Sequence, residues 1–316
     1  MWPTEADPGY GSFVKDQVES LRPLGIEYDT LFINGRESTW NYARGVRELG
    51  RRLRHSDYDL LHAHFGLSGC IGRLQLRKRL VVTFHGYDVL GRPKRDGRIT
   101  AIGRFFQWSS YCLARSADAI IVQSQEMKSK LRLPRAEVIP CGVDLNLFQP
   151  GDQEAVRRSL ALDLDKKYVL FPYNPGEAGK RFDLIQEAVR RASKDLPGLE
   201  ILKVRGKPHA EMPLYMNAAD VLVMASMLEG SPVAVKEAMA CNLPVVAVRV
   251  GDTPELIGRT TGCYLVERDA ASIAAGIVEV CRRSARTSGR DAISHLSMEN
   301  IARRIRDVYD RVLGET

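Results

Sequence analysis

The chain has 316 residues, enough for about two domains of ~150 residues each, and it is 44% hydrophobic and 27% charged. This composition is close to that of average globular proteins and excludes the disordered, collagen-like and coiled-coil classes. The formal net charge is +7, and most of the basic excess lies in residues 1–150.

Apolar runs and cysteines indicate whether the chain spans a membrane and in which compartment it is found. Runs such as 219–228 and 243–248 are well short of the ~20 residues that a membrane-spanning helix needs. The six cysteines show no CxxC spacing, which argues against a zinc ribbon or a disulfide scaffold. The N-terminus lacks the basic and apolar regions of a secretion signal. The sequence therefore predicts a cytoplasmic protein.

Short apolar runs rich in β-branched residues alternate with longer amphipathic stretches, as is typical of a parallel α/β architecture. In the first half we expect strands at 26–33, 58–63, 79–84, 118–123 and 136–139, and helices at 12–24, 39–55 and 100–116. In the second half we expect strands at 168–172, 199–204, 220–225, 244–248 and 263–266, and helices at 152–160, 179–193, 211–218, 232–241, 270–285 and 297–313.

The segment 140–152 is punctuated by Pro, Gly and Asp, and it predicts a domain boundary near residue 150. Two doubly wound domains, 1–150 and 151–316, would leave a cleft between them, and open α/β sheets bind ligands beyond the carboxyl ends of their strands. The first domain has a glycine turn at 7–11 with only six residues before it. We therefore expect its first strand to be missing or shortened, because Met1 is not the true start or the chain is trimmed.

Basic residues are densest in 73–104, where nine arginines and lysines face only Asp88 and Asp96. Such a stretch attracts the phosphates of nucleic acid, of anionic lipid or of a nucleotide; alternatively it is a solvated helix face and loop. No helix-turn-helix, RNP or KH pattern accompanies it, and its charges are not interleaved with aromatic residues. We therefore do not expect nucleic-acid binding.

The segment 229–244 predicts a helix directly after a strand, with Ser231 as its N-cap and Pro232 at the first helical position. The free backbone N–H groups and positive dipole end of such a helix form a site for an anion.

Two acidic residues belong to this segment. Glu229 lies just before the helix, and Glu237 lies on a helix made mostly of apolar residues, where a charge needs a partner or a ligand. Alternatively, Lys236 and Glu237 simply form the solvent-facing side of the helix.

Two places in the sequence have spacings that could suit a metal ion. Asp-x-Asp patterns at 57–59 and 163–165 lie beside expected strands, where ordinary turn chemistry explains them. His62 and His64 alternate on an expected strand, point to the same face and could pair on a metal. Because no third ligand is apparent, the sequence favours a structural role for them and predicts no metal site.

Glu229 and Glu237, framed as EGSPVAVKEAMACNLPVV, resemble the E-x7-E motif of retaining GT-B glycosyltransferases of glycosyltransferase family 4. Other segments resemble the family in matching order, and together they cover nearly the whole chain: PGYGSFVKDQVESLRPLG, LLHAHFG, FHGYDV, VIPCGVDLNLFQP, MPLYMNAADVLVMASMLEGSP and VGDTPELIG. The resemblance implies two Rossmann-like doubly wound domains facing across a cleft. The first would bind an acceptor and the second a nucleotide-diphosphate sugar, and helix 297–313 would pack back toward the first.

The resemblance also implies roles for individual residues. Glu229 would bind hydroxyls of the donor sugar, and Glu237 would bind the ribose hydroxyls of the nucleotide. Sugar and diphosphate would be held by one short segment, Gly230, Ser231, Pro232 and Val233, through its backbone N–H groups, of which the proline has none.

In the first domain, Gly9 and Gly11 would let the backbone approach the diphosphate closely. His85, at the end of an expected strand, matches the family's histidine beside the reacting sugar. Alternatively, it is a hydrogen-bonded histidine at a strand end with a structural role only.

Departure of a nucleoside diphosphate is helped by fixed cations and N–H dipoles. The family usually supplies an arginine and a lysine in the pattern G-R-x4-K-G. Here Lys180 matches the lysine, Pro175 takes the place of the arginine, and Arg181 is a candidate replacement one residue further round the turn. The absent arginine and the shortened start leave an alternative, namely a catalytically impaired protein that binds sugar nucleotides without turnover.

Taken together, the resemblance implies a metal-independent, retaining hexosyltransferase with front-face attack, no cofactor and no side-chain base. The acceptor would be a glycan or lipid-linked molecule, in cell-surface polysaccharide or glycoconjugate synthesis. The stretch 73–108, which includes Phe105, Phe106 and Trp108, would rest on an anionic membrane surface at the inner, cytoplasmic face.

Overall fold

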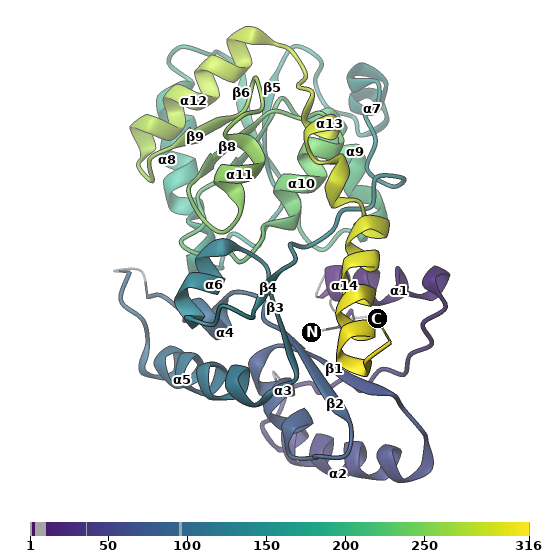
Figure 1. Cartoon of the computed structure of the whole chain (residues 1–316). Helices are drawn as coiled ribbons and strands as arrows, with labels where there is room; N and C mark the ends of the chain where they lie inside the picture. The colour runs from purple at the N-terminus through teal and green to yellow at the C-terminus, as the bar shows by residue number, and fades with distance from the viewer. Residues whose placement is uncertain (1, 4–10, 36, 95–96, 316) are drawn as a thin grey trace. The chain divides into compact units, whose positions relative to one another are not determined.

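The computed structural model describes residues 2–3, 11–35, 37–94 and 97–315, which divide into two compact units. Unit 1 comprises the described residues up to Cys141 together with those from Met298 onward, and unit 2 comprises Gly142–Ser297. Each unit has a parallel sheet with helical connections, so the predicted α/β class is confirmed (Figure 1). Of the predicted glycine turn, Gly11 alone belongs to the described residues. The expected loss or shortening of the first strand concerns residues outside the described ranges and stays a prediction.

The division between the units falls inside the predicted linker, at Cys141 rather than near residue 150. The segment that follows hydrogen-bonds within unit 2. Val143 N donates to the carbonyl oxygen of Leu296 at 3.0 Å, and Gly151 N donates to Asn217 Oδ1 at 2.8 Å. These contacts place the rest of the predicted linker in unit 2.

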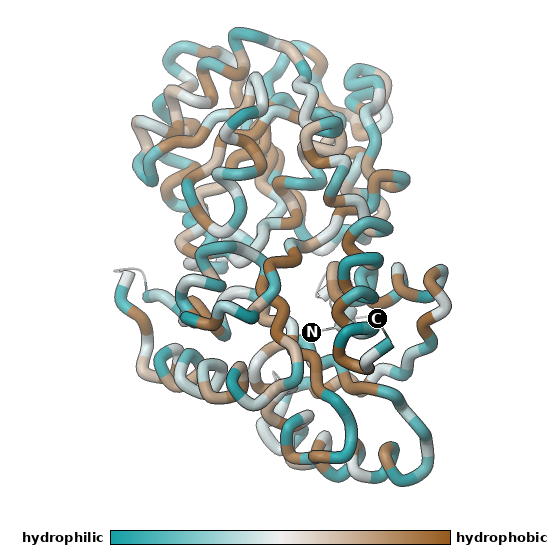
Figure 2. Tube along the Cα trace, viewed as in Figure 1, coloured by the Kyte–Doolittle hydropathy of each residue, from teal (hydrophilic) through white to brown (hydrophobic). Residues whose placement is uncertain are grey.

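Unit 1 contains a four-stranded parallel sheet in the order β1-β2-β3-β4. Its strands are β1 Leu60–His64, β2 Arg79–Thr83, β3 Ala119–Val122 and β4 Glu137–Val138. Apolar residues dominate β2 and β3, which Figure 2 shows as brown stretches of the trace. The helices of this unit are α1 Ser12–Glu19, η1 Arg22–Leu24, α2 Trp40–His55, α3 Gly66–Arg73, α4 Tyr87–Leu90, α5 Ala101–Ser116, α6 Gln125–Leu131 and α14 Met298–Leu313.

Two expectations for the first half were wrong. The segment 26–33 is not a strand, and among the described residues no neighbouring strand pairs with it. The helix expected over 12–24 ends at Glu19 and is followed by a short 3-10 turn that contains Pro23. The proline ring lacks an N–H and clashes with the preceding turn, so a continuous α-helix cannot pass through it.

Unit 2 contains a five-stranded parallel sheet in the order β6-β5-β7-β8-β9. Its strands are β5 Lys167–Phe171, β6 Leu199–Lys203, β7 Val221–Met224, β8 Val245–Val248 and β9 Tyr264–Val266. Its helices are α7 Gln153–Ser159, η2 Ala178–Lys180, α8 Phe182–Ala192, η3 His209–Glu211, α9 Met212–Ala218, α10 Val233–Ala240, α11 Thr253–Ile257, α12 Ala270–Arg283, α13 Gly289–Ala292 and η4 Ser294–Leu296. This order is that of a doubly wound sheet, and all five strands were predicted within about two residues.

The core of unit 2 lies between the sheet and its helices. α8 packs against α12, whereas α10 packs against α9 and α13 (Figure 1). Val169, Phe171, Ile185, Val223 and Ile277 are fully buried in one apolar cluster. Burial of such side chains is the main stabilising contribution to the unit.

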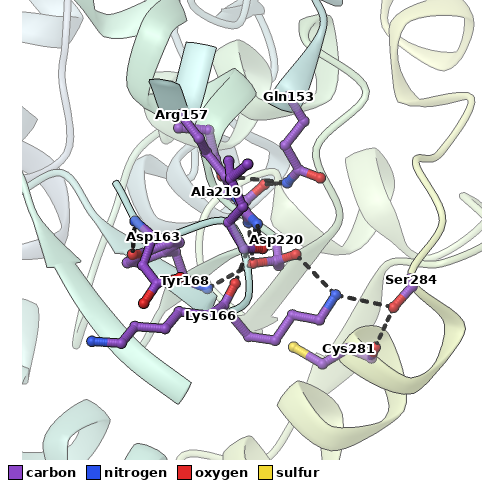
Figure 3. A network of polar contacts seen from close by, with 12 residues as sticks. Gln153, Arg157, Asp163, Lys166, Tyr168, Ala219, Asp220, Cys281 and Ser284 are labelled. Atoms are coloured by element: carbon purple, nitrogen blue, oxygen red, sulfur yellow. Dashed lines mark hydrogen bonds and ion pairs between the residues drawn. The ribbon is translucent and has the colours of Figure 1, made fainter. Parts of the chain in front are cut away.

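A buried polar network joins α7 to the strand starts of unit 2 (Figure 3). Arg157 and Asp220 form an ion pair at 2.7 Å, and both side chains are at most one-tenth exposed. Arg157 Nε donates to the carbonyl oxygen of Ala218 at 2.8 Å, and the Asp220 carboxylate accepts the N–H of Tyr168 at 2.6 Å. The network therefore fixes the amino ends of β5 and β7, opposite the sheet edge where their connecting loops begin.

The last helix, α14, belongs to unit 1 and packs against β2 and α1. Arg304 Nη2 donates to the carbonyl oxygen of Val138 at 2.6 Å, and Tyr309 hydrogen-bonds His62. None of the helices in the described part of the chain is long and apolar enough to cross a membrane.

Candidate functional site

Two side chains predicted for the site, Lys180 and Glu229, and a third that the sequence did not predict, Asp252, follow neighbouring strands of the unit 2 sheet. Lys180 follows β5, Glu229 follows β7, and Asp252 follows β8. Because β5, β7 and β8 are adjacent and parallel, the loops after them meet at the carboxyl edge of the sheet.

Lys180 and Glu229 form an ion pair with Lys180 Nζ 2.6 Å from Glu229 Oε1, and both side chains are mostly buried. The Lys180 ammonium also lies 4.4 Å from the centre of the Tyr173 ring, a cation–π distance. Burial alone would lower the pKa of Lys180, but Glu229, together with Tyr173 and Glu177, outweighs it, and the net shift of the pKa is upward. The lysine is therefore a fixed positive charge at neutral pH.

The residues around Lys180 do not restore the missing arginine in this conformation. Pro175 carries no charge, and the guanidinium of Arg181 bonds its neighbour Asp183 at 3.1 Å. Arg181 has a φ of 52° and occupies the turn that precedes α8.

The predicted helix after Glu229 is present as α10, which begins at Val233. Its N-cap position is Pro232, so the predicted N-cap at Ser231 was wrong. Gly230, Ser231 and Pro232 are buried, so this short loop is part of the packed structure. The alternative that Lys236 and Glu237 face solvent was wrong, since they are 0% and 6% exposed.

Ser231 has a role that the sequence did not suggest. Its hydroxyl donates to Asp252 Oδ2 at 2.7 Å, and Lys236 Nζ hydrogen-bonds the same hydroxyl. Lys236 Nζ also pairs with Asp252 Oδ2 at 2.9 Å. Lys236 and Asp252 were missed as partners because they come from different connections, and no sequence spacing links them.

Glu237 is held by a histidine that sequence reasoning did not single out. His209 Nε2 lies 2.6 Å from Glu237 Oε1, and the His209 ring packs at 5.3 Å from the ring of Phe148. His209 lies on η3, between β6 and α9. The buried carboxylate of Glu237 thus has a hydrogen-bond partner that a ribose hydroxyl could replace.

In unit 1, His85 lies directly after β2 in a chain of hydrogen bonds. Gln123 Nε2 donates to His85 Nδ1 at 2.6 Å, so the proton of the neutral imidazole lies on Nε2. His85 Nε2 lies 2.9 Å from Nδ1 of His64, whose ring stacks on that of His62. The three rings therefore form one polar cluster.

The histidines of this cluster are neutral at pH 7. Burial lowers the pKa of His62 to about 4 and that of His85 to about 3, and it lowers the pKa of His64 as well. The loop after β2 is fixed by Asp88, whose carboxylate accepts the N–H groups of His85 and Gly66 at 3.1 and 3.2 Å. Burial raises the pKa of Asp88 to about 6, although these N–H groups oppose the shift.

Of the two predicted glycines, Gly11 precedes α1 with a φ of 78°, a left-handed conformation that favours glycine. Gly9 lies outside the described residues. The predicted role of both at a diphosphate stays a prediction.

No group of three or more His, Cys, Asp or Glu side chains in the described ranges is placed to hold a metal ion. His62 instead hydrogen-bonds Tyr309 and Thr83, at 2.5 and 2.8 Å. Asp163 Oδ1 accepts the N–H of Asp165, which is the turn chemistry expected there.

Two family models match the chain. Residues 8–147 match the model described as Glycosyltransferase Family 4, and residues 177–283 match the model described as Glycosyl transferases group 1. D-inositol 3-phosphate glycosyltransferase of Mycobacterium tuberculosis (strain ATCC 25618 / H37Rv) is 26% identical over an aligned region of 322 positions, gaps included, which covers 87% of this chain. The chain spans only 66% of the length of that relative.

Solved structures share the fold. Sucrose-phosphate synthase from Thermosynechococcus elongatus superposes with a TM-score of 0.82 at 22% identity, covering 100% of this chain and 96% of its own. HepE of Anabaena, in complex with UDP-glucose, superposes with a TM-score of 0.65 at 19% identity, covering 86% of this chain and 82% of its own.

Proposed function

Because this chain belongs to the glycosyltransferases of family 4 and group 1 and has their GT-B fold, we propose that it is a retaining glycosyltransferase. Its donor is a nucleotide-diphosphate sugar, and its acceptor is a glycan or a lipid-linked molecule. We place it in the synthesis of a cell-surface polysaccharide or glycoconjugate, on the cytoplasmic side.

The pair of Lys180 and Glu229 beside the start of α10 carries this proposal. A nucleoside diphosphate leaves as a polyanion, and a fixed ammonium with free backbone N–H groups stabilises such charge as it develops. Lys180 contacts the diphosphate, Glu229 accepts hydroxyls of the donor sugar, and Glu237 exchanges His209 for the ribose hydroxyls.

In the proposed reaction the bond between the anomeric carbon and the phosphate oxygen breaks. The acceptor hydroxyl forms the new glycosidic bond on the same face, and its proton goes to the departing phosphate oxygen. The configuration is therefore retained, and neither a metal ion nor a side-chain base takes part. His85, neutral with its proton on Nε2, would have to exchange its bond to His64 Nδ1 for a hydroxyl of the reacting sugar.

Relatives indicate which nucleotide to test first. Structures of HepE contain UDP or UDP-glucose, and a structure of TarM from S. aureus contains UDP. The first donor candidates are therefore UDP-sugars.

The proposal is tested by thermal stabilisation of the full chain with a panel of nucleoside diphosphates and nucleotide sugars. We expect UDP to raise the Tm of wild type and of Glu154→Ala, a variant of an exposed glutamate on α7. Glu237→Ala should lose the shift, because Glu237 is the buried carboxylate assigned to the ribose. If every nucleotide leaves the Tm unchanged, the donor site proposed here is wrong.

A second candidate function is a sugar-nucleotide-binding protein without turnover. It is favoured by Pro175 in the place of the arginine and by the bond of Arg181 to Asp183. Binding of UDP-sugar with no release of UDP over hours would identify it.

A further inference from the structure

Lys236 is the most deeply buried charge of the second unit. It lies in the middle of α10 with 0% of its surface exposed, and its ammonium is 2.9 Å from Asp252 Oδ2. A lysine in such a place loses its hydration, and a buried ion pair is seldom more stabilising than apolar side chains of equal volume. Stability alone therefore gives a poor reason for Lys236 to be there.

The position of the pair is more informative than its strength. Lys236 and the hydroxyl of Ser231 both bond the same carboxylate oxygen of Asp252. The other oxygen, Asp252 Oδ1, is buried and has no hydrogen-bond partner in the part of the chain that the structure describes. Lys236 and Ser231 thus hold Asp252, and through it they join the loop after β8 to the loop after β7.

The backbones of these two loops also touch directly. Gly251 has a φ of 56°, and a Cβ added there would lie 2.7 Å from the carbonyl oxygen of Gly230 and 3.0 Å from that of Glu229. Because no side chain separates the two loops at Gly251, a shift of Asp252 would displace the backbone of Gly230 and Ser231. Close packing of this kind makes the position of one loop depend on the other.

We propose that Lys236 is a positioning residue of the donor site. Through Asp252 and Ser231 it fixes the Glu229 carboxylate and the N–H groups at the start of α10 in the geometry that a sugar diphosphate needs. Preorganised donors stabilise developing charge without rearrangement, and small displacements of such groups are costly. This inference rests on the proposed function.

The test compares two variants that each remove one partner of a buried ion pair in the same unit. Lys236→Met breaks the pair beside the proposed site, and Arg157→Met breaks the pair with Asp220 at the opposite sheet edge. UDP affinity is measured by calorimetry on the full chain, well below the Tm of each variant. Circular dichroism checks that each variant is folded.

Both variants should lower the Tm, but only Lys236→Met should weaken UDP binding, by about tenfold or more. Arg157→Met should bind UDP within about twofold of wild type. Should Lys236→Met fail to fold, Ser231→Ala is the second variant; it keeps the ion pair, and its UDP affinity should still fall. A folded Lys236→Met or Ser231→Ala that binds UDP as wild type does would overturn the inference alone. A wild-type chain that binds no nucleoside diphosphate would overturn the proposed function and this inference with it.

Discussion

At the scale of single residues, the contact between Lys180 and Glu229 is the most informative feature of the protein. Both side chains are mostly buried, and the ammonium of the lysine lies over the ring of Tyr173, so both side chains are held in place. A pair held in this way presents one cation and one carboxylate at fixed positions at the carboxyl edge of the sheet. This is the chemistry that a sugar diphosphate requires from its site.

Lys180→Met should lower kcat/KM for the donor by about a hundredfold, because a positive charge aimed at the leaving group is lost. The rate of UDP release measures the effect. The matched control is Lys194→Met, which removes an exposed lysine of the same unit and should leave the rate unchanged. Equal rates in wild type and Lys180→Met would exclude the assigned role.

The histidine cluster of unit 1 predicts how stability depends on pH. His62 and His85 have pKa values lowered to about 4 and about 3, from an ordinary value of 6.5. In the unfolded chain each histidine binds a proton below its ordinary pKa of 6.5, whereas in the folded chain His62 stays neutral until the pH falls to about 4. The stability present above pH 6.5 is therefore lost as the pH falls toward 4. Each histidine contributes about 1.4 kcal/mol per pH unit in that window.

Asp88 acts in the opposite sense, because its pKa is raised from 3.8 to about 6. Its protonation on acidification favours the folded state and offsets part of the loss. Urea unfolding at pH 7, 6 and 5 should show falling stability in wild type and a shallower fall in His62→Gln. The control His55→Gln, at an exposed position, should follow wild type. A pH-independent wild type would contradict this reading of the cluster.

At the scale of elements, α5 carries the surface proposed to meet a membrane. Ile102, Phe105, Trp108 and Tyr111 are exposed large apolar side chains spaced three residues apart on this helix. Many of the basic residues of 73–104 precede it in the sequence. Exposed aromatic residues beside cations favour binding to anionic lipid surfaces.

Phe105→Ser combined with Trp108→Ser should therefore reduce sedimentation with vesicles that contain anionic lipid at low salt. Trp40→Ser removes an equally exposed aromatic side chain from α2 and should not change it. The membrane proposal is wrong if wild type does not sediment with such vesicles.

The elements also show what the sequence can and cannot predict. All strands of unit 2 were predicted. The apolar runs of β7 and β8 are buried throughout, whereas the edge strands β6 and β9 are partly exposed and still show as short apolar runs. The short helices α3, α4, α6, α11 and α13 were missed, since so few residues show a helical period only weakly; α7 and α9, with seven residues each, were predicted. The segment 26–33 has the composition of a strand, but a strand also needs a partner, and pairing is a tertiary property.

The same limit applies to the candidate site. A motif with fixed spacing located Glu229 and Glu237, and the order of segments along the chain located Lys180. The partners of these residues could not be predicted in the same way. His209 and Asp252 come from other connections, and only the folded sheet brings them to Glu237 and Lys236.

At the scale of the whole molecule, the chain combines two parallel-sheet units that carry different functional side chains. Unit 2 carries the carboxylates and the lysine assigned to the donor, and unit 1 carries the neutral histidine cluster and α5. This division agrees with two family models that match different halves of the chain. We propose that both sets of residues serve one transfer reaction.

That claim is tested most directly by proton NMR of UDP-sugars incubated with the full chain, with water or an added acceptor as the receiver. We expect release of UDP, a product with the anomeric configuration of the donor, and a rate at least about a hundredfold lower in Glu229→Gln. An inverted product, or a donor that stays intact while UDP binds, would contradict it.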